Sequence, residues 1–348
     1  MYKSKRWAPL PVAVSATDSR IRYIGRFDRR DKNGPRCAWS ASAVQLKFVG
    51  TALNVGLNES GGDELQIVID GKPTDVLKPQ KGPGWYTVAE NLPKGEHTAL
   101  LMKRTEAGVG TTQFLGFQLE AGARLLSLPK RPRHRIEVIG DSITCGYGNE
   151  GADRNQHFKP ATENAYLTYG AIAARNLDAE YVGIAWSGRT MYPSFTIPEI
   201  YDLALPSDPA SAWDFRLWAP EVVVINLGTN DFGGKANPEQ KPWSDAYKAF
   251  LARLHKVYPK STTIYLATGP MMSDGWPPNR KALSTLKGYL NQIAADQKQA
   301  GDTRIRTIDF AMQEEKNGIG SDWHPSVRTH EIMAAHLTET LRRDLNWK

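Results

Sequence analysis

The sequence is poor in the features that define several large classes of protein. Among its 348 residues are 2 cysteines, Cys37 and Cys145, and no Cys-x-x-Cys pair, so neither a zinc ribbon nor a disulfide framework is indicated. Both are expected to be small buried residues. No segment approaches the roughly eighteen consecutive apolar residues that span a bilayer, so we expect no membrane segment. A hydrophobic content of 41% with 23% charged residues describes an ordinary globular protein.

The net charge of +7 raises the question of nucleic-acid binding. Lysine and arginine are scattered, however, and no basic stripe interleaved with aromatic residues is present, so we expect no nucleic-acid partner. The charge suits solubility or attraction to an anionic polysaccharide. The amino end resembles a signal peptide only faintly, because Pro9 and Pro11 interrupt a short apolar run. A first strand is expected there, over residues 7–16.

Residues 1–128 are expected to form a first domain built from strands. Apolar and polar residues alternate over short segments separated by turn residues, at 43–49, 53–57, 65–69, 85–88, 97–102 and 112–119. Asp70-Gly71 follows the third segment and is a strong hairpin signal. The spacing predicts an antiparallel β-sandwich, a jelly roll, and such a module could bind sugar. Trp39 and Trp85 are the aromatic candidates for that task, although packing in the core explains each of them better.

Residues 129–348 are expected to form a second domain of the α/β class, beginning with a proline-rich, basic linker over 129–135. Strands are expected at 136–139, 181–186, 221–227, 263–267 and 304–310, and helices at 162–175, 244–257, 281–299 and 326–345. The third strand is apolar throughout, as in a strand that is covered on both faces. The alternation predicts a doubly wound parallel sheet with its site at the carboxyl ends of the strands.

A serine follows the first strand of this second domain, in the stretch Gly-Asp-Ser-Ile-Thr-Cys-Gly-Tyr-Gly at residues 140–148. A serine on the tight turn after a buried strand is pushed out of the core, with its hydroxyl above the sheet. That position is a mechanical requirement for a nucleophile, although the better-known elbow Gly-x-Ser-x-Gly is absent. Ser142 is therefore a candidate nucleophile, and a serine that only caps the next helix is the alternative.

Other strands should deliver polar residues to the same rim of the sheet. The segments concerned are residues 187–189 after the second strand, 228–231 after the third and 322–326 after the fifth. Acyl transfer needs such a set: a hydroxyl, a base, an orienter for the base and donors for the developing oxyanion. The Gly188 N–H and the Asn230 side-chain N–H would join the Ser142 amide as an oxyanion hole. Taken singly, each of these turns has a simpler explanation as ordinary turn chemistry.

His324 is the candidate base, because it lies just before the last helix and close to this rim. Asp322 beside it is the candidate orienter. His330 and His336 belong to the following helix and share no face with His324, so we expect no metal site. The chemistry expected here needs neither a metal ion nor an organic cofactor.

These blocks resemble, in order, the motifs of the SGNH hydrolase superfamily: Gly-Asp-Ser-Ile-Thr at 140–144, Gly188, Gly-Thr-Asn at 228–230 and His-Pro at 324–325. The longer form at 140–148, the Asp-Trp-His-Pro-Ser ending at 322–326 and the preceding β-sandwich resemble carbohydrate esterase family two. Members of that family remove acetyl groups from xylan and glucomannan. The resemblance covers nearly the whole chain and implies an SGNH hydrolase domain over residues 129–348.

One position departs from the superfamily pattern. Most SGNH enzymes place the acid three residues before the histidine, and Ser321 occupies that position here. Asp322 lies only two residues before His324. Family two resembles this sequence in that respect. The resemblance implies that some of its members use a Ser–His dyad in which a backbone carbonyl orients the histidine. A triad with Asp322 and a dyad of Ser142 and His324 therefore both stay open.

The resemblance implies a secreted or periplasmic serine esterase that removes acetyl groups from plant cell-wall polysaccharide through an acetyl-enzyme. We expect an acetylated polysaccharide or oligosaccharide as its partner, a monomer, and a signal peptide that has been trimmed from this sequence. Trp276, in a loop rich in glycine and proline, could stack on a sugar ring, and packing under the loop is the alternative. Two other functions remain: a lipase or thioesterase on the same fold, and a carbohydrate-binding protein with a relic hydrolase site.

Overall fold

The computed structural model describes residues 11–348, which form two compact units. The first unit extends to Arg131 and also includes Leu203–Ser211, whereas the second consists of Pro132–Asp202 and Ala212–Lys348. The sequence did not reveal that residues 203–211 belong with the first unit. The expected first strand falls partly on residues 1–10, outside the described residues, and the remainder contains strand β1, Val12–Ser15.

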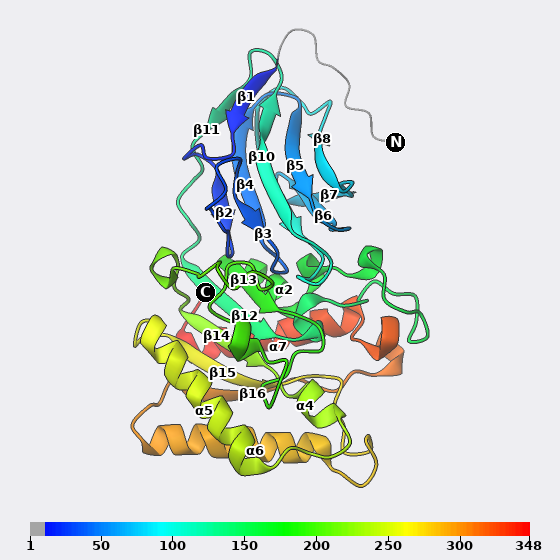
Figure 1. The fold of residues 1–348 in the computed structure, drawn as a ribbon, viewed down its shortest axis with the longest axis vertical. Coiled ribbons are helices and arrows are strands. Elements are labelled where there is room, and N and C mark those ends of the chain that lie inside the picture. The colour runs from blue at the N-terminus through cyan, green and yellow to red at the C-terminus, as the bar shows by residue number, and fades with distance from the viewer. Residues whose placement is uncertain (1–10) are drawn as a thin grey trace. The chain divides into compact units, whose positions relative to one another are not determined.

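The first unit is the predicted sandwich of two antiparallel sheets (Figure 1). One sheet has the order β1-β10-β5-β8, with β3 also paired to β10, and the other has the order β11-β4-β9-β6-β7, with β2 paired to β4. Their bounds are β2 Arg22–Ile24, β3 Arg36–Cys37, β4 Ala43–Val49, β5 Leu53–Glu59, β6 Leu65–Ile69, β7 Lys72–Leu77, β8 Gly82–Ala89, β9 Glu96–Lys103, β10 Thr112–Leu119 and β11 Arg124–Leu126. The hairpin at Asp70-Gly71 is confirmed, since both residues have positive φ, 51° and 77°, and join β6 to β7.

The core of the sandwich forms where the apolar faces of the two sheets meet, and Phe48, Phe114 and Phe117 are fully buried in it. Trp39 is also fully buried, and its Nε1–H donates to the carbonyl of Leu203 at 3.0 Å. The expectation of core packing was wrong for Trp85, whose side chain is 39% exposed. Strand alternation explains this result, because the neighbouring Tyr86 takes the core-facing position on β8.

The second unit contains the predicted parallel sheet, in the order β13-β12-β14-β15-β16. Its strands are β12 His134–Gly140, β13 Ala179–Ala185, β14 Val222–Asn226, β15 Thr263–Thr268 and β16 Ile305–Asp309. The chain therefore starts at β12, steps to one side to β13 and then returns past β12 to β14. A crevice opens at such a reversal, above the carboxyl ends of the strands, and Ser142 follows β12 directly at this point.

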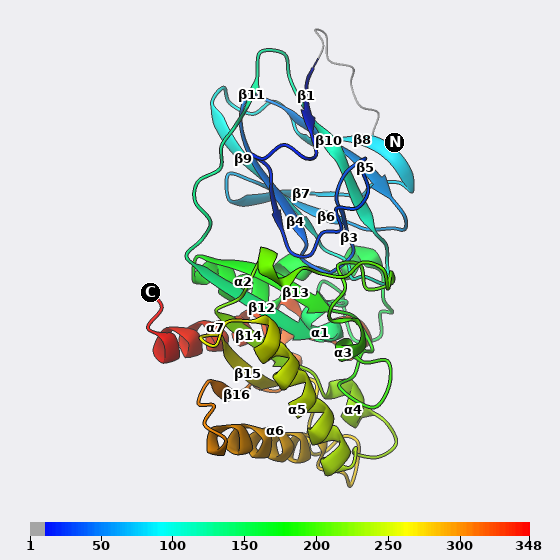
Figure 2. The same ribbon diagram turned by 60° about the vertical axis from the view of Figure 1, so that its left-hand side comes forward.

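The longer helices of this unit cover both faces of the sheet (Figures 1 and 2). Helices α2 (Tyr169–Asn176) and α7 (Val327–Leu345) pack together, as do α5 (Gln240–Val257) and α6 (Ala282–Gln299). The helix expected at 162–175 begins only at Tyr169, because Asn164 caps a short 3₁₀ turn instead and holds the preceding chain against the carbonyl of Gly146. Within the described residues, no helix combines the length and the apolar character needed to cross a membrane.

Candidate active site

Ser142 is the first residue of the short helix α1, Ser142–Cys145, immediately after β12. Asp141 caps this helix, and its carboxylate accepts a hydrogen bond from the N–H of Ile143 at 3.0 Å. The strand, the cap and the helix together fix the serine in the turn, where its side chain stays 7% exposed. The sequence expectation of a serine held on a strand-to-helix turn therefore matches the geometry.

The imidazole of His324 joins Ser142 to the main chain of its own loop. Nε2 lies 2.8 Å from the Ser142 Oγ, and Nδ1 lies 3.1 Å from the carbonyl oxygens of both Ser321 and Asp322. A carbonyl oxygen can only accept, so Nδ1 carries the proton and Nε2 of the neutral ring is the acceptor that faces the serine hydroxyl. The pair thus has the protonation pattern that a general base requires.

Burial lowers the pKa of His324 below its ordinary value of 6.5, and the hydrogen bonds to the two carbonyls only partly offset this effect. The imidazole is consequently neutral at pH 7. A neutral ring with a free Nε2 lone pair can accept the serine proton during attack.

The carboxylate of Asp322 does not contact the imidazole, which corrects the expectation of a side-chain orienter. One oxygen accepts from the Tyr147 hydroxyl at 2.8 Å and from the N–H of Phe158 at 3.0 Å, and the other lies 2.8 Å from Nδ1 of His157. Burial raises the pKa of Asp322, but these hydrogen bonds outweigh it and hold the pKa below 3.8. Asp322 stays ionised and faces away from its expected partner.

Ser321, at the position where most superfamily members carry the acid, is enclosed by two glycines. A methyl group on Gly148 would come within 2.4 Å of the Ser321 Cβ, and one on Gly151 would come within 2.3 Å of the Ser321 Oγ. Ser321 itself is fully buried. The site therefore has no room for an aspartate side chain, and the main-chain carbonyls take over the contact with Nδ1.

Tyr147 contacts His324 as well, and sequence reasoning missed it. Its ring lies 4.1 Å from that of His324 between centroids, and the Phe158 ring stacks on it with its centroid at 4.5 Å. Its hydroxyl donates to Asp322. The only sequence signal was its place between two glycines in the stretch that contains Ser142.

Asn230 lies on α4, Thr229–Gly233, and links the other two predicted oxyanion donors. Its Nδ2 donates to the carbonyl of Arg189 at 2.9 Å and approaches the Asp141 carboxylate at 3.4 Å. Arg189 follows Gly188, and Asp141 precedes Ser142. The side chain of Asn230 is therefore bonded to the chain neighbours of both Gly188 and Ser142, which brings the three predicted donors into one region.

Asp231, the next residue, fastens the loop that carries Gly188. Its carboxylate accepts from the N–H groups of Met191 and Tyr192, at 3.1 and 3.0 Å, and from the indole of Trp243 at 2.7 Å. Burial raises the pKa of Asp231, and burial raises that of Asp141 to about 7. Nothing in the sequence singled out Asp231 except its place in the Gly-Thr-Asn-Asp block.

A cavity of about 690 Å³ opens beside Asn230. Its lining includes Met271, Met272, Trp276 and Trp323. The indoles of Trp276 and Trp323 are 73% and 55% exposed. The alternative of Trp276 packed under its loop is thus excluded, and Trp323, which sequence reasoning passed over, is a second aromatic surface at the same cavity.

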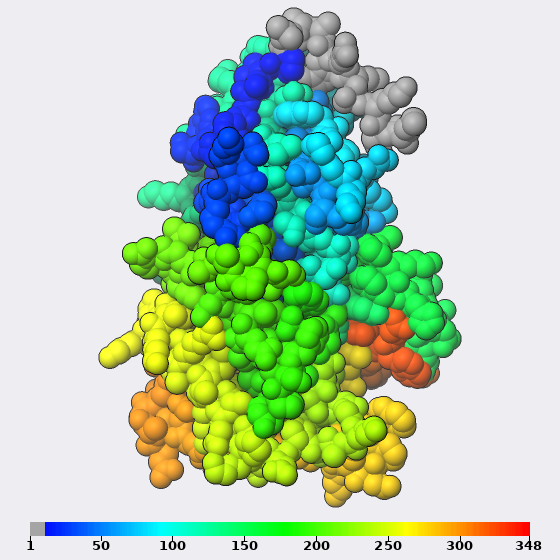
Figure 3. All heavy atoms as spheres, in the orientation of Figure 1, coloured from blue at the N-terminus to red at the C-terminus, as the bar shows by residue number. Residues whose placement is uncertain are grey.

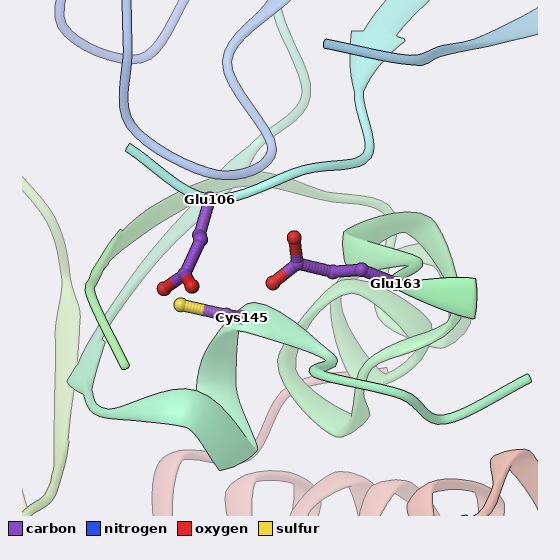
Figure 4. A group of neighbouring side chains, drawn as sticks. All are labelled: Glu106, Cys145 and Glu163. Carbon is purple, nitrogen blue, oxygen red and sulfur yellow. The ribbon is translucent and has the colours of Figure 1, made fainter. Parts of the chain in front are cut away.

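The second cysteine, Cys145, is buried as expected, and so is Cys37; neither forms a disulfide. Cys145 ends helix α1, and its Sγ lies within 4.8 Å of a carboxylate oxygen of the buried Glu163 (Figure 4).

Family models match both parts of the chain. The model "Carbohydrate esterase 2 N-terminal" matches residues 23–129, and "GDSL-like Lipase/Acylhydrolase family" matches residues 138–332. Among solved structures, a family two carbohydrate esterase from Clostridium thermocellum, in complex with cellohexaose, is 39% identical with a TM-score of 0.89; the match covers 94% of this chain and 100% of that one.

Two curated relatives have names that include an esterase activity. Cellulase/esterase CelE of Acetivibrio thermocellus is 40% identical over 333 residues, which are 94% of this chain but only 40% of CelE. The chain thus spans less than half the length of that relative. A Cellvibrio japonicus protein named "Acetylxylan esterase / glucomannan deacetylase" is 29% identical, with 99% of this chain and 94% of its own length covered.

Proposed function

Because the chain belongs to carbohydrate esterase family two, a family of carboxylic ester hydrolases, we propose that it removes acetyl groups from plant cell-wall polysaccharide, with acetylated xylan or glucomannan as substrate. The observation that carries the proposal is the 2.8 Å hydrogen bond between Nε2 of His324 and Oγ of Ser142. A relative 29% identical to this chain bears the name of both activities, which supports the choice of polymers.

In this mechanism Ser142 Oγ attacks the acetyl carbonyl carbon while Nε2 of His324 takes the hydroxyl proton. The N–H groups of Ser142 and Gly188 and the side chain of Asn230 stabilise the oxyanion. When the carbon–oxygen bond to the sugar breaks, His324 returns the proton to the leaving hydroxyl oxygen. Water, deprotonated by His324, then attacks the acetyl-enzyme and releases acetate and the free serine.

The test is acetate release from acetylated xylan and from acetylated glucomannan by the wild type and by Ser142→Ala. We expect release by the wild type from at least one polymer, and a loss of at least about 10³-fold in the variant. Acetate release that persists in Ser142→Ala would reject the assignment of Ser142 as the nucleophile. Turnover of p-nitrophenyl acetate without any release from either polymer would reject the polysaccharide assignment.

Trp276 and Trp323 are proposed to hold the sugar, because aromatic faces stack on the apolar faces of pyranose rings. We expect Trp323→Ala and Trp276→Ala to raise KM for acetylated oligosaccharides by roughly 10-fold, about 1.4 kcal/mol of binding each. KM for p-nitrophenyl acetate, which has no sugar, should change less than 2-fold. Equal changes in KM for both substrates would mean that these indoles stabilise the loop and do not contact the sugar.

Two other functions are tested by the same enzyme preparation. A lipase or thioesterase would cleave p-nitrophenyl octanoate faster than the acetate, whereas the proposed enzyme prefers acetate. A relic that only binds carbohydrate would bind oligosaccharide and turn over no acetyl ester. The direct Ser142–His324 hydrogen bond supports turnover over the relic.

The sandwich is proposed to bind glycan through the sheet face that carries Trp85. Three adjacent atoms of the Trp85 ring lie 3.0–3.2 Å from where a Gly56 Cβ would be, so the indole lies face-on against the strand and turns its other face outward. Strand β8, which carries it, forms one edge of its sheet, and cyan atoms of this region lie at the surface (Figures 1 and 3). The exposed Asn58 shares this face, and amides pair well with sugar hydroxyls.

We expect Trp85→Ala to weaken retention on insoluble xylan at least 3-fold, measured in the Ser142→Ala background so that no acetate is removed. Thr74→Ala, at an exposed position of β7 in the other sheet, is the control. Unchanged retention of Trp85→Ala on insoluble xylan would reject the proposal that the sandwich binds glycan through this face. Export from the cytoplasm is proposed with the polysaccharide substrate, which lies outside the cell.

A further inference from the structure

We propose that the side chain of Asp322 is a positioning group: anchored by Tyr147 and Phe158, it holds its own backbone so that the Asp322 carbonyl accepts Nδ1–H of His324. The inference rests on the proposed function, in which His324 is the base. It gives Asp322 a role in catalysis that requires neither contact with the imidazole nor the negative charge.

The backbone at this point is in a conformation that needs support. Asp322 and the following Trp323 have positive φ, 49° and 66°, and two successive non-glycine residues in the left-handed region are unfavourable. The turn places the carbonyls of Ser321 and Asp322 on the same side, where both lie 3.1 Å from Nδ1. If the turn relaxed, the Asp322 carbonyl would leave Nδ1.

Contacts with two short stretches, residues 147–148 and 156–158, hold this turn. The N–H of Asp322 donates to the carbonyl of Gln156 at 3.0 Å, and the N–H of Ser321 donates to that of Gly148 at 2.9 Å. The Asp322 carboxylate adds the bonds from the Tyr147 hydroxyl and the Phe158 N–H. Residues 147–148 and 156–158 thus hold the turn through both its main chain and the Asp322 side chain.

Tyr147 connects the anchor to the base in a second way. The same ring whose hydroxyl bonds Asp322 packs against His324 in a tilted geometry, with 4.1 Å between centroids and 31° between planes. The imidazole is therefore fixed at its edge by carbonyls and across its face by Tyr147. His157 adds a third bond to Asp322, but its side chain is 92% exposed, so we assign it a small share.

Replacement by asparagine separates the anchor from the charge. In Asp322→Asn the remaining carbonyl oxygen can still accept from Tyr147 and Phe158, the amide can donate to a neutral His157, and asparagine tolerates the left-handed region. Asp322→Ala removes the anchor and keeps a Cβ in the strained conformation. Tyr147→Phe keeps the stacked ring and removes a single hydrogen bond.

The experiment measures kcat and KM for p-nitrophenyl acetate in these variants, with Asp153→Ala as a matched control. The exposed Asp153 also accepts a main-chain N–H, that of Asn155 at 2.7 Å, in the neighbouring loop. We expect kcat to fall roughly 10- to 100-fold in Asp322→Ala, as for a base displaced by about 1 Å, and KM to change less than 3-fold. Asp322→Asn should lose no more than about 3-fold in kcat, Tyr147→Phe should lose between 3- and 10-fold, and Asp153→Ala should match the wild type.

A loss in Asp322→Asn as large as that in Asp322→Ala would overturn the proposal in favour of the charge, and wild-type kcat in Asp322→Ala would overturn it outright. Thermal unfolding of each variant identifies loss of fold. If Asp322→Ala does not fold, Tyr147→Phe decides, and an unchanged kcat there rejects the anchor. Ser142→Ala separates the two proposals: an active Ser142→Ala defeats both, whereas an inactive one beside a fully active Asp322→Ala defeats the anchor alone.

Discussion

The Nδ1 atom of His324 lies 3.1 Å from the main-chain oxygen of Asp322, while the carboxylate of the same Asp322 bonds to Tyr147, His157 and Phe158. Asp322 therefore contacts the imidazole of His324 through its backbone carbonyl and not through its carboxylate. The uncharged carbonyl oxygens of Ser321 and Asp322 therefore keep the proton of the imidazole on Nδ1. The contacts are those of a Ser142–His324 pair without a side-chain acid.

Ser321→Asp should fail to restore a triad. The fully buried Ser321 is hemmed in by Gly148 and Gly151, so a larger, charged side chain would overpack the site. We expect a loss of about 2 kcal/mol or more in the free energy of unfolding and no gain in kcat. Chemical denaturation with kcat for p-nitrophenyl acetate provides the check, beside Ser321→Ala as the size-reducing control. A stable Ser321→Asp with raised kcat would contradict the packing argument.

The pH profile of kcat/KM should have its acid limb below pH 6.5. Attack needs the neutral imidazole, and burial lowers the pKa of His324, so activity rises as pH increases through that lowered pKa and is level by pH 7. The measurement is kcat/KM for p-nitrophenyl acetate between pH 4.5 and 8. A midpoint above 7 would mean that an ionic partner raises the histidine pKa.

Asn230→Ala should lower kcat by roughly 10²- to 10³-fold, about 3 to 4 kcal/mol, if its amide stabilises the oxyanion. KM for p-nitrophenyl acetate should change less than 3-fold, because the ground-state carbonyl carries little charge. The exposed Asn155 supplies the control variant, Asn155→Ala. A loss that appears in KM alone would assign Asn230 to substrate binding.

Stability should respond to pH through Asp141, whose pKa burial raises from 3.8 to about 7. The folded state favours the protonated acid, so this contribution to stability is full below pH 4 and is lost as pH rises toward 7. Asp141→Asn cannot ionise. Its free energy of unfolding, relative to the wild type, should therefore increase by about 2 kcal/mol between pH 5 and pH 8.

Denaturant unfolding of both proteins at the two pH values provides this check on Asp141. Asp153→Asn, at an exposed carboxylate, should give the same difference from the wild type at both. A pH-independent difference for Asp141→Asn would show that Asp141 is ionised throughout that range.

Local patterns determined the fold in outline. The period-two segments of the sandwich and the apolar run at Val222–Asn226 depend only on side-chain alternation and on burial of both faces, so the sequence revealed them. The helix expected from residue 162 was too long, because a contact between Asn164 and Gly146, distant in the chain, decides where it begins. Trp85 was misassigned for a similar reason, since alternation fixes which residues share a face but not which face is inside.

The sequence by itself predicted that Ser142 and His324 lie together at one rim of the sheet, because the motifs and the order of strands and helices suffice to place them there. Only the tertiary structure decided which groups contact Nδ1 of His324. Ser321 is too tightly enclosed for an acid, and Asp322 is turned outward by a left-handed backbone that Tyr147 and Phe158 hold from another loop. Such contacts depend on distances between segments far apart in the chain, and no spacing of residues along the sequence encodes those distances.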